Sequence, residues 1–385
     1  MQKQSEKTKV NVVYIITKLE LGGAQKICLS LFEKLQKNGN DAYLISGTEG
    51  PLVARAKRIP NSILLDNMKR EVSTNALTHE IKNFFNIVRT LRKLKKTNPN
   101  LIVHTHSTKA GLVGRWAAFF AGVKKRVHTV HGYGFHTHQP LLVWLGIYLL
   151  ELFTSVITTH FVCVSSADIE TGKKLFPKFI QKSSIIRAAV PSKEFYIPAT
   201  EIKKAPIRKE FIFGTVACFK QQKNLFDLLK AFKKVFSQNP KARLEIIGDG
   251  ELRPAIEEWI KEHKFNGVIT LHGWRHSVAP IMLTWNSFVL SSLWEGLPCA
   301  IVEARLLKLP VLSYKTGGIH DIIHNGDNGF LYKQGHWGDL ADGMLEIMKN
   351  KPLYSKLRSF NEDLSDFDEE SMITQHVDLY KQLSL

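Results

Sequence analysis

The chain has 385 residues, of which 44% are apolar and 23% charged, and its formal net charge is +18. This length is too great for one ordinary hydrophobic core and suits two domains of roughly 150–200 residues each. No apolar run reaches the roughly 20 residues of a membrane-spanning helix, the start of the chain is too polar for a secretion signal, and the four cysteines lack the short spacing of a disulfide framework or zinc motif. We therefore expect a cytoplasmic protein of two domains.

The positive charge lies entirely in the first part of the chain. Residues 1–204 contain 31 Lys and Arg against 13 Asp and Glu, whereas residues 205–385 contain 22 of each kind. Such an excess indicates an acidic partner: nucleic acid, an anionic membrane or a phosphorylated substrate. Lysine used only for solubility is the alternative, although a drift in composition should affect both halves.

Short β-branched segments alternate with longer amphipathic segments along the chain. In the first half we expect strands over residues 10–16, 101–103, 127–130 and 161–164, with a helix from about Ala24 to Lys37. In the second half we expect strands over residues 211–216, 244–247, 268–271, 288–290 and 310–312. This alternation predicts an α/β protein with two Rossmann-like, doubly wound parallel sheets covered by helices on both faces.

A segment with three prolines and no periodicity separates the two series, at residues 190–206, and it is the best linker candidate. We divide the chain into an N-terminal domain (1–195), a linker (196–207), a C-terminal domain (208–367) and a terminal helix (368–385). Two such domains are expected to face a central cleft at the carboxyl ends of their strands, where ligands bind.

The segment from Ser292 to Ala304 carries two glutamates. Glu295 is expected in a loop, and Glu303 inside the helix that follows Pro298. Each carboxylate oxygen can accept a hydrogen bond from a sugar hydroxyl, so the pair suits recognition of a sugar or a ribose. Taken alone, the two residues could also be a partner of the helix dipole and a solvated helix glutamate.

Glu295 and Glu303, in a Glu-Gly-Leu-Pro context, resemble the signature of the family-four retaining glycosyltransferases, also called glycosyl transferases group 1. Further segments resemble that family in the same order, at residues 22–25, 128–135, 248–253, 271–274, 316–319 and 325–330. The resemblance implies the GT-B fold, in which a C-terminal helix crosses back to the first domain. It also implies that the first domain binds the acceptor and the second the nucleotide-sugar donor.

The resemblance assigns roles to individual residues. Those expected to bind the nucleotide-sugar are Gly22, Gly23, Lys220, Lys223, Gly248, Arg253, Glu295, Gly296, Leu297, Glu303, Gly317 and Gly318. The glycines let backbone amides approach a pyrophosphate, and helix N-termini add a favourable dipole. Glu295 would contact the donor sugar, Glu303 the ribose and Arg253 the edge of the base. We expect His131 and Glu295 to be the catalytic residues, and we assign no protein nucleophile.

One position departs from the family pattern, which has an Arg and a Lys five residues apart. Cys218 stands where the Arg is expected, whereas Lys223 keeps the Lys. A thiol cannot form the bidentate bonds of a guanidinium. We expect Lys220 to supply the missing charge, and an ordinary surface lysine is the alternative. The departure leaves open a non-catalytic GT-B relative that binds nucleotide-sugar or partners and transfers nothing.

Six histidines between residues 104 and 138 raise the question of a metal. His104 and His106 form a His-x-His pair of the kind that can bind zinc, but no cysteine or carboxylate accompanies it at ligand spacing. We expect the two side chains to point to opposite faces of their strand and to line the acceptor side. We therefore expect no metal and no cofactor, with the nucleotide-sugar as donor substrate.

The most apolar segment, residues 139–153, is too short to span a bilayer. It suits either a buried helix or a helix that rests in the lipid interface beside Lys124, Lys125 and Arg126. The second interpretation fits an acceptor linked to polyprenyl diphosphate. We thus predict a retaining hexosyltransferase of bacterial lipopolysaccharide or capsule synthesis, which moves a hexose or N-acetylhexosamine from a nucleotide-sugar, with UDP the expected carrier. It would work on a lipid-linked saccharide at the cytoplasmic face of an anionic inner membrane.

Two more functions are alternatives. A nucleic-acid-binding protein would fit the charge, but no nucleic-acid motif is present and the charges are not interleaved with exposed aromatic residues, so no nucleic-acid partner is expected. A sugar-nucleotide epimerase could share the architecture, but Glu295 and Glu303 resemble the transferases. The sequence predicts no oligomeric state.

Overall fold

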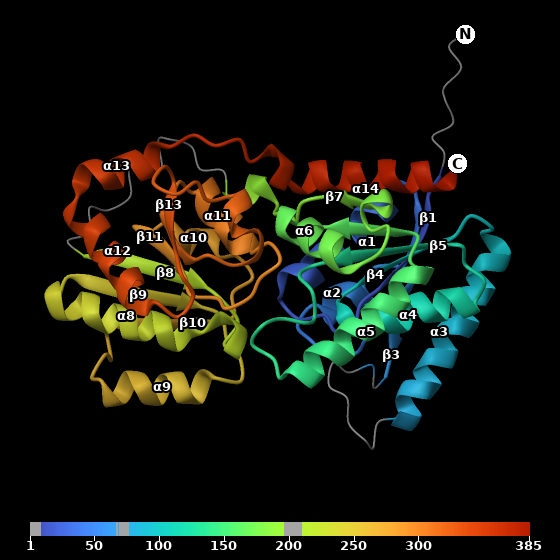
Figure 1. Cartoon of the computed structure of the whole chain (residues 1–385), viewed down its shortest axis with the longest axis horizontal. Coiled ribbons are helices and arrows are strands. Elements are labelled where there is room, and N and C mark those ends of the chain that lie inside the picture. The colour runs from blue at the N-terminus through green and yellow to red at the C-terminus, as the bar shows by residue number, and fades with distance from the viewer. Residues whose placement is uncertain (1–8, 67, 69–76, 196–209) are drawn as a thin grey trace, which may run out of the picture. The chain divides into compact units, whose positions relative to one another are not determined.

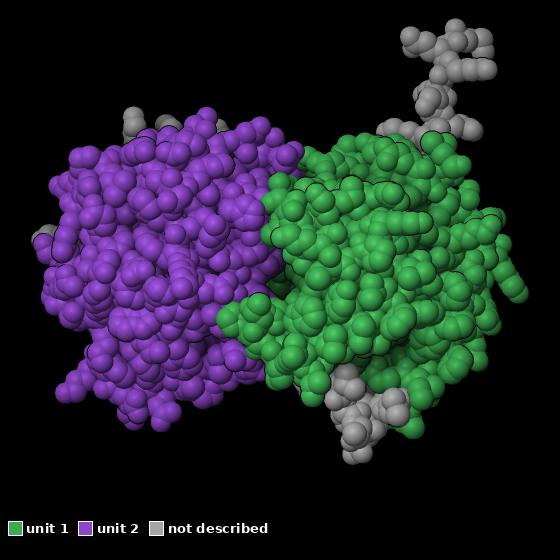
Figure 2. Space-filling model, in the orientation of Figure 1, with its two compact units in different colours: residues 1–188, 370–385 green, residues 189–369 purple. Residues whose placement is uncertain are grey.

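The computed structural model describes residues 9–66, 68, 77–195 and 210–385. The chain divides into two compact units, of which the first comprises Met1–Ala188 with Glu370–Leu385 and the second Ala189–Glu369 (Figure 2). Each unit contains one sheet (Figure 1). The linker expected at residues 196–207 lies outside the described residues.

The first unit contains a seven-stranded parallel sheet with strand order β3-β2-β1-β4-β5-β6-β7. Its strands are β1 (Asn11–Ile15), β2 (Asp41–Gly47), β3 (Ser62–Leu65), β4 (Ile102–His106), β5 (Lys125–Val130), β6 (His160–Cys163) and β7 (Ser183–Ile185). Every residue of the central strand β4 is buried. Burial on both faces explains why a strand such as β1, Asn-Val-Val-Tyr-Ile, is a nearly continuous apolar run without polar alternation.

Seven α-helices of the described residues accompany this sheet: α1 (Gly23–Lys37), α2 (Val53–Lys57), α3 (Leu77–Thr97), α4 (Thr108–Phe120), α5 (Leu141–Ile157), α6 (Ser166–Leu175) and α14 (Glu369–Ser384). On α1, the buried residues Ile27, Leu31 and Leu35 recur every four positions, which is the spacing of one helix face. Val103 of β4 and Leu91 of α3 belong to one buried cluster. Helix α4 packs between α3 and α5.

The second unit contains a six-stranded parallel sheet with strand order β10-β9-β8-β11-β12-β13. Its strands are β8 (Phe211–Val216), β9 (Ala242–Ile247), β10 (Ile269–Gly273), β11 (Ser287–Leu290), β12 (Val311–Tyr314) and β13 (Gly329–Tyr332). The two doubly wound parallel sheets confirm the predicted fold class.

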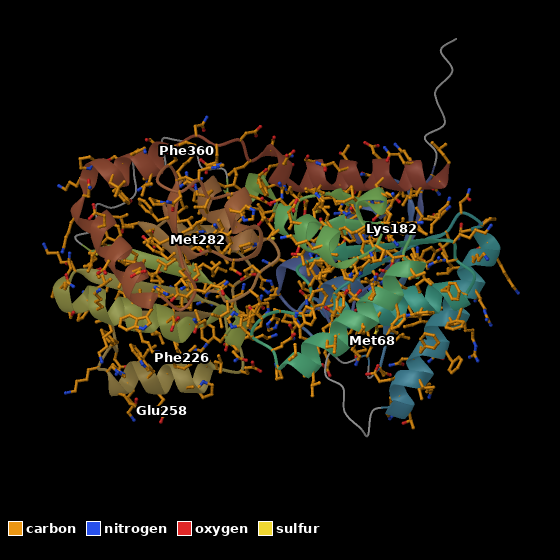
Figure 3. All side chains as sticks on the ribbon, viewed as in Figure 1. Met68, Lys182, Phe226, Glu258, Met282 and Phe360 are labelled. Atoms are coloured by element: carbon orange, nitrogen blue, oxygen red, sulfur yellow. The ribbon has the colours of Figure 1, made fainter. Side chains whose placement is uncertain are left out.

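The α-helices described in the second unit are α8 (Leu225–Gln238), α9 (Arg253–Glu262), α10 (Ala279–Met282), α11 (Cys299–Leu306), α12 (Trp337–Lys349) and α13 (Lys351–Ser359). Helices α8 and α12 pack against each other, and Leu228, Phe232 and Val235 of α8 enter the buried core. Met282 of α10 is also fully buried, whereas Glu258 of α9 points to solvent (Figure 3).

Helix α14, red in Figure 1, follows the second unit in the chain but belongs to the first. Its Tyr380 is fully buried, with the hydroxyl 3.1 Å from that of Tyr14 in β1 and 2.5 Å from Nδ1 of His104 in β4. Lys34 of α1 donates a hydrogen bond of 2.7 Å to Glu370. The expected terminal helix is therefore present and crosses back to the first unit.

Helix α5 buries polar residues and exposes large apolar ones, while its half-buried residues Trp144, Ile147, Tyr148 and Leu152 pack against the apolar core. Its buried residues are all polar, namely Glu151, Thr154 and Ser155. Leu142, Phe153 and Val156 are 82%, 65% and 78% exposed. The segment is therefore not the fully buried helix that was one of its two interpretations. Within the described ranges, no helix combines the length and apolarity that crossing a bilayer demands.

The polar inner face of α5 is paired with groups on α4. The fully buried guanidinium of Arg115 donates a hydrogen bond of 2.7 Å to Glu151 and one of 3.0 Å to Thr158. Trp116 Nε1 donates one of 3.0 Å to Thr154. These bonds hold α5 on the unit, so its outer apolar face is fixed in its exposed position.

Candidate active site

Both sheets have a topological switch point, where the strand order reverses direction. In the first unit the chain builds from β1 to β2 and β3 and then returns to β4 beside β1; in the second it builds from β8 to β9 and β10 and returns to β11 beside β8. Ligands of open α/β sheets bind outside the carboxyl ends of the strands at such points. The loops after β1, β4, β8 and β11 are therefore the places where a site is expected.

In the first unit, the loops that follow β1 and β4 are joined by a hydrogen bond. Thr17 Oγ1 lies 2.9 Å from Ser107 Oγ. Gly22 is extended, with φ −82°, and precedes Gly23, the first residue of α1. A Cβ on Gly22 would come 2.5 Å from Oε1 of Gln25, which is a side-chain end that can move. Gly22 and Gly23 thus lie at the start of α1, after the carboxyl end of β1.

His131 directly follows β5 and contacts the end of β4. Its Nε2 lies 2.9 Å from Nδ1 of His106, the last residue of β4. Burial lowers the pKa of His131 to about 3, and the nearby His376 of α14 acts in the same direction. The imidazole is therefore neutral at neutral pH.

His104 and His106 do not have the positions expected for them. Both side chains are fully buried, so neither lines an acceptor surface, and their ring centroids are 4.5 Å apart. Residues i and i+2 of a strand point to the same side of the sheet, so the expected split between faces was wrong. The ring nitrogens of His104 are engaged by the hydroxyls of Tyr380, at 2.5 Å, and Thr129, at 2.7 Å.

In the second unit, Lys223 and Glu295 form an ion pair at the switch point. Lys223 ends the 3-10 turn η4 (Gln221–Lys223) after β8, and Glu295 lies in the loop after β11. The side chains are only 16% and 8% exposed. Desolvation by burial lowers the pKa of Lys223, but the Glu295 carboxylate more than offsets this, and the pKa is raised overall. The ammonium therefore stays charged.

Gly317 lies against the backbone of the Glu295 loop. It begins the 3-10 turn η5 (Gly317–Asp321) after β12 with φ 50°, and a Cβ on it would lie 2.1 Å from the carbonyl oxygen of Glu295. The amide of Gly318 donates a hydrogen bond of 2.6 Å to the carbonyl of Gly296. Only glycine fits this approach without strain.

Hydrogen bonds that sequence reasoning missed hold these loops together. Gln222 Nε2 donates to the Trp294 carbonyl at 2.7 Å, and the Leu293 amide donates to the Gln222 carbonyl at 2.8 Å. Thr316 Oγ1 donates to the Leu293 carbonyl at 3.2 Å. The buried Leu297 follows in the same loop. Gln222 belongs to no recognised motif, so its role could have been predicted only from its position in the loop after β8.

The turn after β9 lies against the loop after β8. Gly248 has φ 135°, and a Cβ on it would come 1.9 Å from the carbonyl oxygen of Ala217. Arg253, the first residue of α9, forms ion pairs of 2.8 Å with Asp249 and 2.7 Å with Glu257. Gly248 therefore borders the site through the β8 loop, and Arg253 is held beside the same turn.

The remaining expected residues lie on the same loops and on α11. The Cys218 thiol is close enough to Lys223 to help raise its pKa. Lys220 is the half-buried residue before η4. Glu303 lies in α11, downstream of the Glu295 loop, and is 7% exposed. The structure thus brings Cys218, Lys223 and Glu295 together and places Lys220 and Glu303 on adjoining segments.

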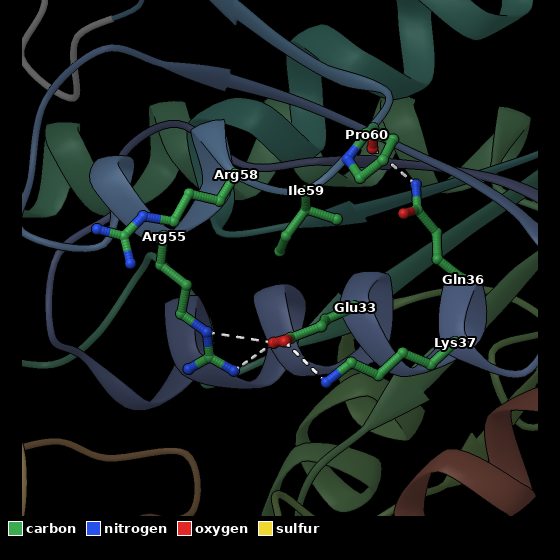
Figure 4. Close-up of a pocket in the computed structure, with 7 residues that line it drawn as sticks. All are labelled: Glu33, Gln36, Lys37, Arg55, Arg58, Ile59 and Pro60. Atoms are coloured by element: carbon green, nitrogen blue, oxygen red, sulfur yellow. Dashed lines mark hydrogen bonds and ion pairs between the residues drawn. The ribbon is translucent and has the colours of Figure 1, made fainter.

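Neither a metal site nor a surface hollow competes with these loops. In the described part of the chain, no group of three or more His, Cys, Asp and Glu side chains could hold a metal ion. A hollow between α1 and α2 (Figure 4) includes Gln36, which donates to the carbonyls of Ala42 and Pro60 near the starts of β2 and β3. The hollow therefore lies at the amino ends of the strands, the opposite edge of the sheet from His131.

Two family models match the chain. The model for Glycosyltransferase Family 4 matches residues 21–186, and that for Glycosyl transferases group 1 matches residues 199–363. The two matches fall within the first and the second unit, respectively.

Known relatives and solved structures agree with this assignment. The UDP-Gal:alpha-D-GlcNAc-diphosphoundecaprenol alpha-1,3-galactosyltransferase of Escherichia coli is 30% identical over 361 residues, which cover 91% of each chain. The capsular polysaccharide biosynthesis glycosyltransferase CapM of Staphylococcus aureus is 24% identical over 336 residues, or 83% of this chain and 84% of CapM.

Among solved structures, HepE of Anabaena in complex with UDP and glucose has a TM-score of 0.80 at 16% identity, covering 97% of this chain and 99% of HepE. The pneumococcal O-GlcNAc transferase GtfA in complex with UDP and GlcNAc has a TM-score of 0.77 at 12% identity, with 98% and 99% covered. These likenesses extend over nearly the whole chain and show a shared fold. The chain therefore belongs to the glycosyltransferases of family 4 and group 1, and it is a GT-B glycosyltransferase of bacterial polysaccharide biosynthesis.

Proposed function

We propose that the chain is a retaining hexosyltransferase that moves a hexose or N-acetylhexosamine from a UDP-sugar to a saccharide carried on polyprenyl diphosphate. The reaction takes place at the anionic cytoplasmic face of the inner membrane, in the synthesis of lipopolysaccharide or capsule. The observation that carries the proposal is the buried Lys223–Glu295 pair at a switch point, with the backbone of Gly317 packed against it.

The donor diphosphate binds beside Lys223. Its ammonium stays charged, and the Gly317 amide at the start of η5 is the one we expect to approach a phosphate oxygen, because the Gly318 amide already donates to the Gly296 carbonyl. Departure of the nucleoside diphosphate builds negative charge, and stabilising that charge lowers the barrier to transfer. UDP is supported as the carrier by the Escherichia coli relative, whose name contains UDP-Gal, and by the UDP bound in HepE and GtfA.

The two glutamates recognise hydroxyl groups. Glu295 accepts a hydrogen bond from Lys223 at Oε1, and its other carboxylate oxygen is available to a hydroxyl of the donor sugar. Glu303 accepts hydrogen bonds from the ribose. Arg253 lies at the edge of the base with Gly248, and its ion pairs with Asp249 and Glu257 fix the plane of the guanidinium.

His131 contributes a neutral hydrogen-bonding group from the first unit. With its pKa lowered to about 3 by burial, it is not a proton-donating acid at neutral pH, and we assign it a hydrogen bond to the donor sugar. We assign no covalent nucleophile.

Cys218 replaces a cation of the family pattern, and Lys220 supplies the charge in its place. Lys220 lies two residues further along the same loop, immediately before η4. An ammonium offers a point charge where a guanidinium would offer a planar fork. This difference predicts a donor diphosphate bound by charge and backbone amides more than by bidentate contacts.

The acceptor and the membrane meet the first unit at the apolar face of three helices. Its large exposed residues are Ile81 and Phe85 of α3, Phe119 and Phe120 of α4, and Leu141, Leu142, Val143, Leu145, Leu149, Leu150, Phe153 and Val156 of α5. We call this set the α3–α5 face. Exposed patches of this kind mark interfaces with proteins or membranes, and aromatic residues among leucines suit the lipid interface.

Cations lie beside the exposed rings of the α3–α5 face. The Arg126 guanidinium stands 5.5 Å from the Phe119 ring centroid, and Arg92 donates a hydrogen bond of 3.1 Å to the Phe120 carbonyl. Each cation near an anionic membrane contributes about 1 kcal/mol. The surplus charge of residues 1–204 therefore favours a lipid surface as the partner of this face.

A lipid-linked acceptor can reach the site from this face. Residues 131–140 connect His131, after β5, to the start of α5 at Leu141, so the site loop and the exposed helix are continuous. The name of the Escherichia coli relative contains GlcNAc-diphosphoundecaprenol, which is a substrate of this chemical class.

The proposal is tested in two steps. First, thermal unfolding is followed with UDP, GDP and ADP. A ligand at a hundred times its Kd adds about 2.7 kcal/mol to the free energy of unfolding. Each kcal/mol raises the unfolding temperature by roughly 2–4 °C. We expect UDP to stabilise the wild type and Lys241→Ala, an exposed control, but not Lys223→Ala. Second, transfer from UDP-hexoses and UDP-N-acetylhexosamines to GlcNAc-diphosphoundecaprenol in anionic vesicles is assayed, and NMR reads the anomeric configuration of the product.

Each outcome has a meaning. Stabilisation by UDP together with a product of retained configuration supports the proposal. Stabilisation without transfer from any UDP-hexose or UDP-N-acetylhexosamine favours the non-catalytic relative. A product of inverted configuration contradicts the retaining mechanism, and no stabilisation by any diphosphate contradicts the donor site itself.

A further inference from the structure

His106 is a buried histidine whose only described partner is the site residue His131. It ends β4, is fully buried, and its Nδ1 lies 2.9 Å from Nε2 of His131. Its other ring nitrogen, Nε2, is also buried and has no hydrogen-bond partner among the described residues. A hydrogen bond between two neutral imidazoles requires one protonated and one bare nitrogen, so the position of a single proton decides which ring donates.

The environment of His106 decides the direction of this hydrogen bond. If His131 donated from Nε2, then Nδ1 of His106 would be bare and its proton would lie on the buried, unpartnered Nε2. Buried N–H groups without an acceptor are rarer than buried acceptors without a donor. The favoured arrangement therefore has the proton of His106 on Nδ1, from which it donates to Nε2 of His131.

The groups around His106 cannot supply another partner. The His104 ring, 4.5 Å away, has both nitrogens engaged by Tyr380 and Thr129. The Tyr14 ring centroid lies 6.0 Å away, and the Tyr14 hydroxyl is bonded to Tyr380. His376 of α14 stacks on His104 and hydrogen-bonds the Met372 carbonyl through Nδ1.

We infer that His106 is a positioning residue: it donates a hydrogen bond to Nε2 of His131, so that His131 keeps its proton on Nδ1 and offers an N–H donor to the substrate. His131 is half-buried, and its Nδ1 is neither bonded in the described part of the chain nor among the buried unpartnered atoms. The hydrogen bond made by one ring nitrogen sets the tautomer seen at the other. A substrate oxygen is thus met by a donor and not by a basic nitrogen.

The state of the two rings supports this assignment. Burial lowers the pKa of His106 well below its usual value, with His104, His131 and His376 acting in the same direction, and burial lowers that of His131 to about 3. Both rings are therefore neutral at neutral pH. The inference rests on the proposed function only in giving His131 a substrate oxygen to meet; the tautomer itself does not depend on it.

Nitrogen NMR of histidine-labelled protein tests the tautomer without any substrate. At neutral pH we expect His131 to show a protonated Nδ1 and a bare Nε2, and His131→Asn identifies its signals. A protonated Nε2 in the wild type overturns the inference. His106→Asp replaces the donor with an acceptor at the same distance from the backbone, and we expect it to move the proton of His131 to Nε2. An unchanged His131 in that variant overturns the inference as well.

Kinetics test the consequence for transfer. We expect kcat to fall at least tenfold in His106→Leu and in His106→Asp, with the KM for acceptor within threefold. His106→Asn, whose side-chain amide can donate from the same position, should recover most of the rate. His128→Asn is the matched control, because His128 is also buried but bonds Thr105, and its kcat should stay within twofold. Equal losses in the Asn and Leu variants overturn the positioning role.

The two proposals fail in different ways. A wild-type protein that transfers no sugar defeats the proposed function, whereas the NMR result still decides the hydrogen bond between His106 and His131. A wild-type protein that is active with His131 protonated on Nε2 defeats the inference alone.

Discussion

Lys223 and Glu295 form a largely buried ion pair although 72 positions separate them in the chain. One follows the first strand of the second sheet and the other follows the strand that returns beside it. The pair therefore exists only because the sheet reverses its strand order at this point. The pair also keeps the charged Lys223 ammonium where an anionic ligand can bind to it.

Glu295→Gln should separate the structural and the catalytic contribution of this pair. Removing one partner of a buried pair costs about 3–5 kcal/mol, because the other charge stays buried. We expect the free energy of unfolding to fall by about 3 kcal/mol. We also expect kcat to fall about 100-fold, which corresponds to an activation barrier higher by about 2.7 kcal/mol. UDP should bind more tightly, since its diphosphate becomes the counter-ion of Lys223. Denaturant unfolding, calorimetry and steady-state kinetics measure the three effects.

Glu210→Gln is the control for that experiment. It breaks the pair between Arg243 and Glu210, whose side chains are 28% and 42% exposed. Exposed pairs contribute about 0–1 kcal/mol, and this one should leave UDP affinity unchanged. Equal losses of stability in the two variants would contradict the buried character of the Lys223 pair.

Gly317→Ala should damage the donor site through the backbone. Its φ is 50°, and a Cβ would meet the Glu295 carbonyl oxygen at 2.1 Å, so the Glu295 loop must shift. Gly326 has φ 87° but nothing within 4 Å of its Cβ position, so Gly326→Ala carries only the conformational cost of about 1 kcal/mol. We expect UDP affinity to drop at least tenfold for Gly317→Ala and less than twofold for Gly326→Ala, as measured by calorimetry. Equal UDP affinities in the two variants would contradict the close packing of Gly317 against the Glu295 loop.

Charges on the α3–α5 face should abolish membrane binding and leave the donor site intact. We expect the double variant Leu142→Glu and Phe153→Glu to lose sedimentation with anionic vesicles and transfer to a lipid-linked acceptor. Stabilisation by UDP should not change. Trp337→Glu, on an exposed tryptophan of α12 in the other unit, is the control that should still sediment. Full sedimentation of the double variant would exclude this face as the membrane contact.

The buried histidines of the first unit predict a loss of stability in acid. Burial lowers the pKa of seven histidines described in this unit, namely His104, His106, His128, His131, His136, His160 and His376. For His376 the folded value is about 4, whereas the unfolded value is near 6.5. Between those two values the unfolded chain binds more protons, so the free energy of unfolding falls as pH falls, by about 1.4 kcal/mol per pH unit for each histidine.

Urea unfolding at about pH 7.5, 6 and 5 measures this slope. His376→Gln should remove one histidine's share between pH 6.5 and about 4. The exposed His336 provides the control His336→Gln, which should keep the full slope. An identical slope in the His376 variant and the wild type would be inconsistent with a buried neutral imidazole.

Much of the fold could be predicted because parallel strands buried on both faces leave continuous apolar runs. β8 is found where it was expected, over Phe211–Val216, and the tight approaches of Gly248 and Gly317 explain the glycines that marked their loops. The boundaries of β4 and β12 were less accurate, because polar residues such as His104, His106 and Ser313 extend these strands. Because these residues are polar, the sequence did not indicate that the strands continue through them. Their burial within the sheet accounts for their place in a strand.

The orientation of α5 could not be predicted, because apolar content does not say which side of a helix faces solvent. Leu142 and Phe153 would suit a core as well as a lipid surface, and the outcome depends on whether α4 offers polar or apolar partners. Arg115 and Trp116 of α4 provide polar ones. By contrast, strand geometry alone places His104 and His106 on the same side of the sheet. The expectation of opposite faces misapplied that geometry.

The place of α14 has a consequence for the order of synthesis. Tyr380 completes the buried hydrogen bonds of Tyr14 and His104, yet the ribosome reaches it only after the whole of Ala189–Glu369. At about 5–20 residues per second, that delay lasts about 10–40 s. Throughout this time the nascent first unit has β1 and β4 but not the hydroxyl that joins them. A pause in translation within the second unit would therefore prolong the exposure of an unfinished core in the first.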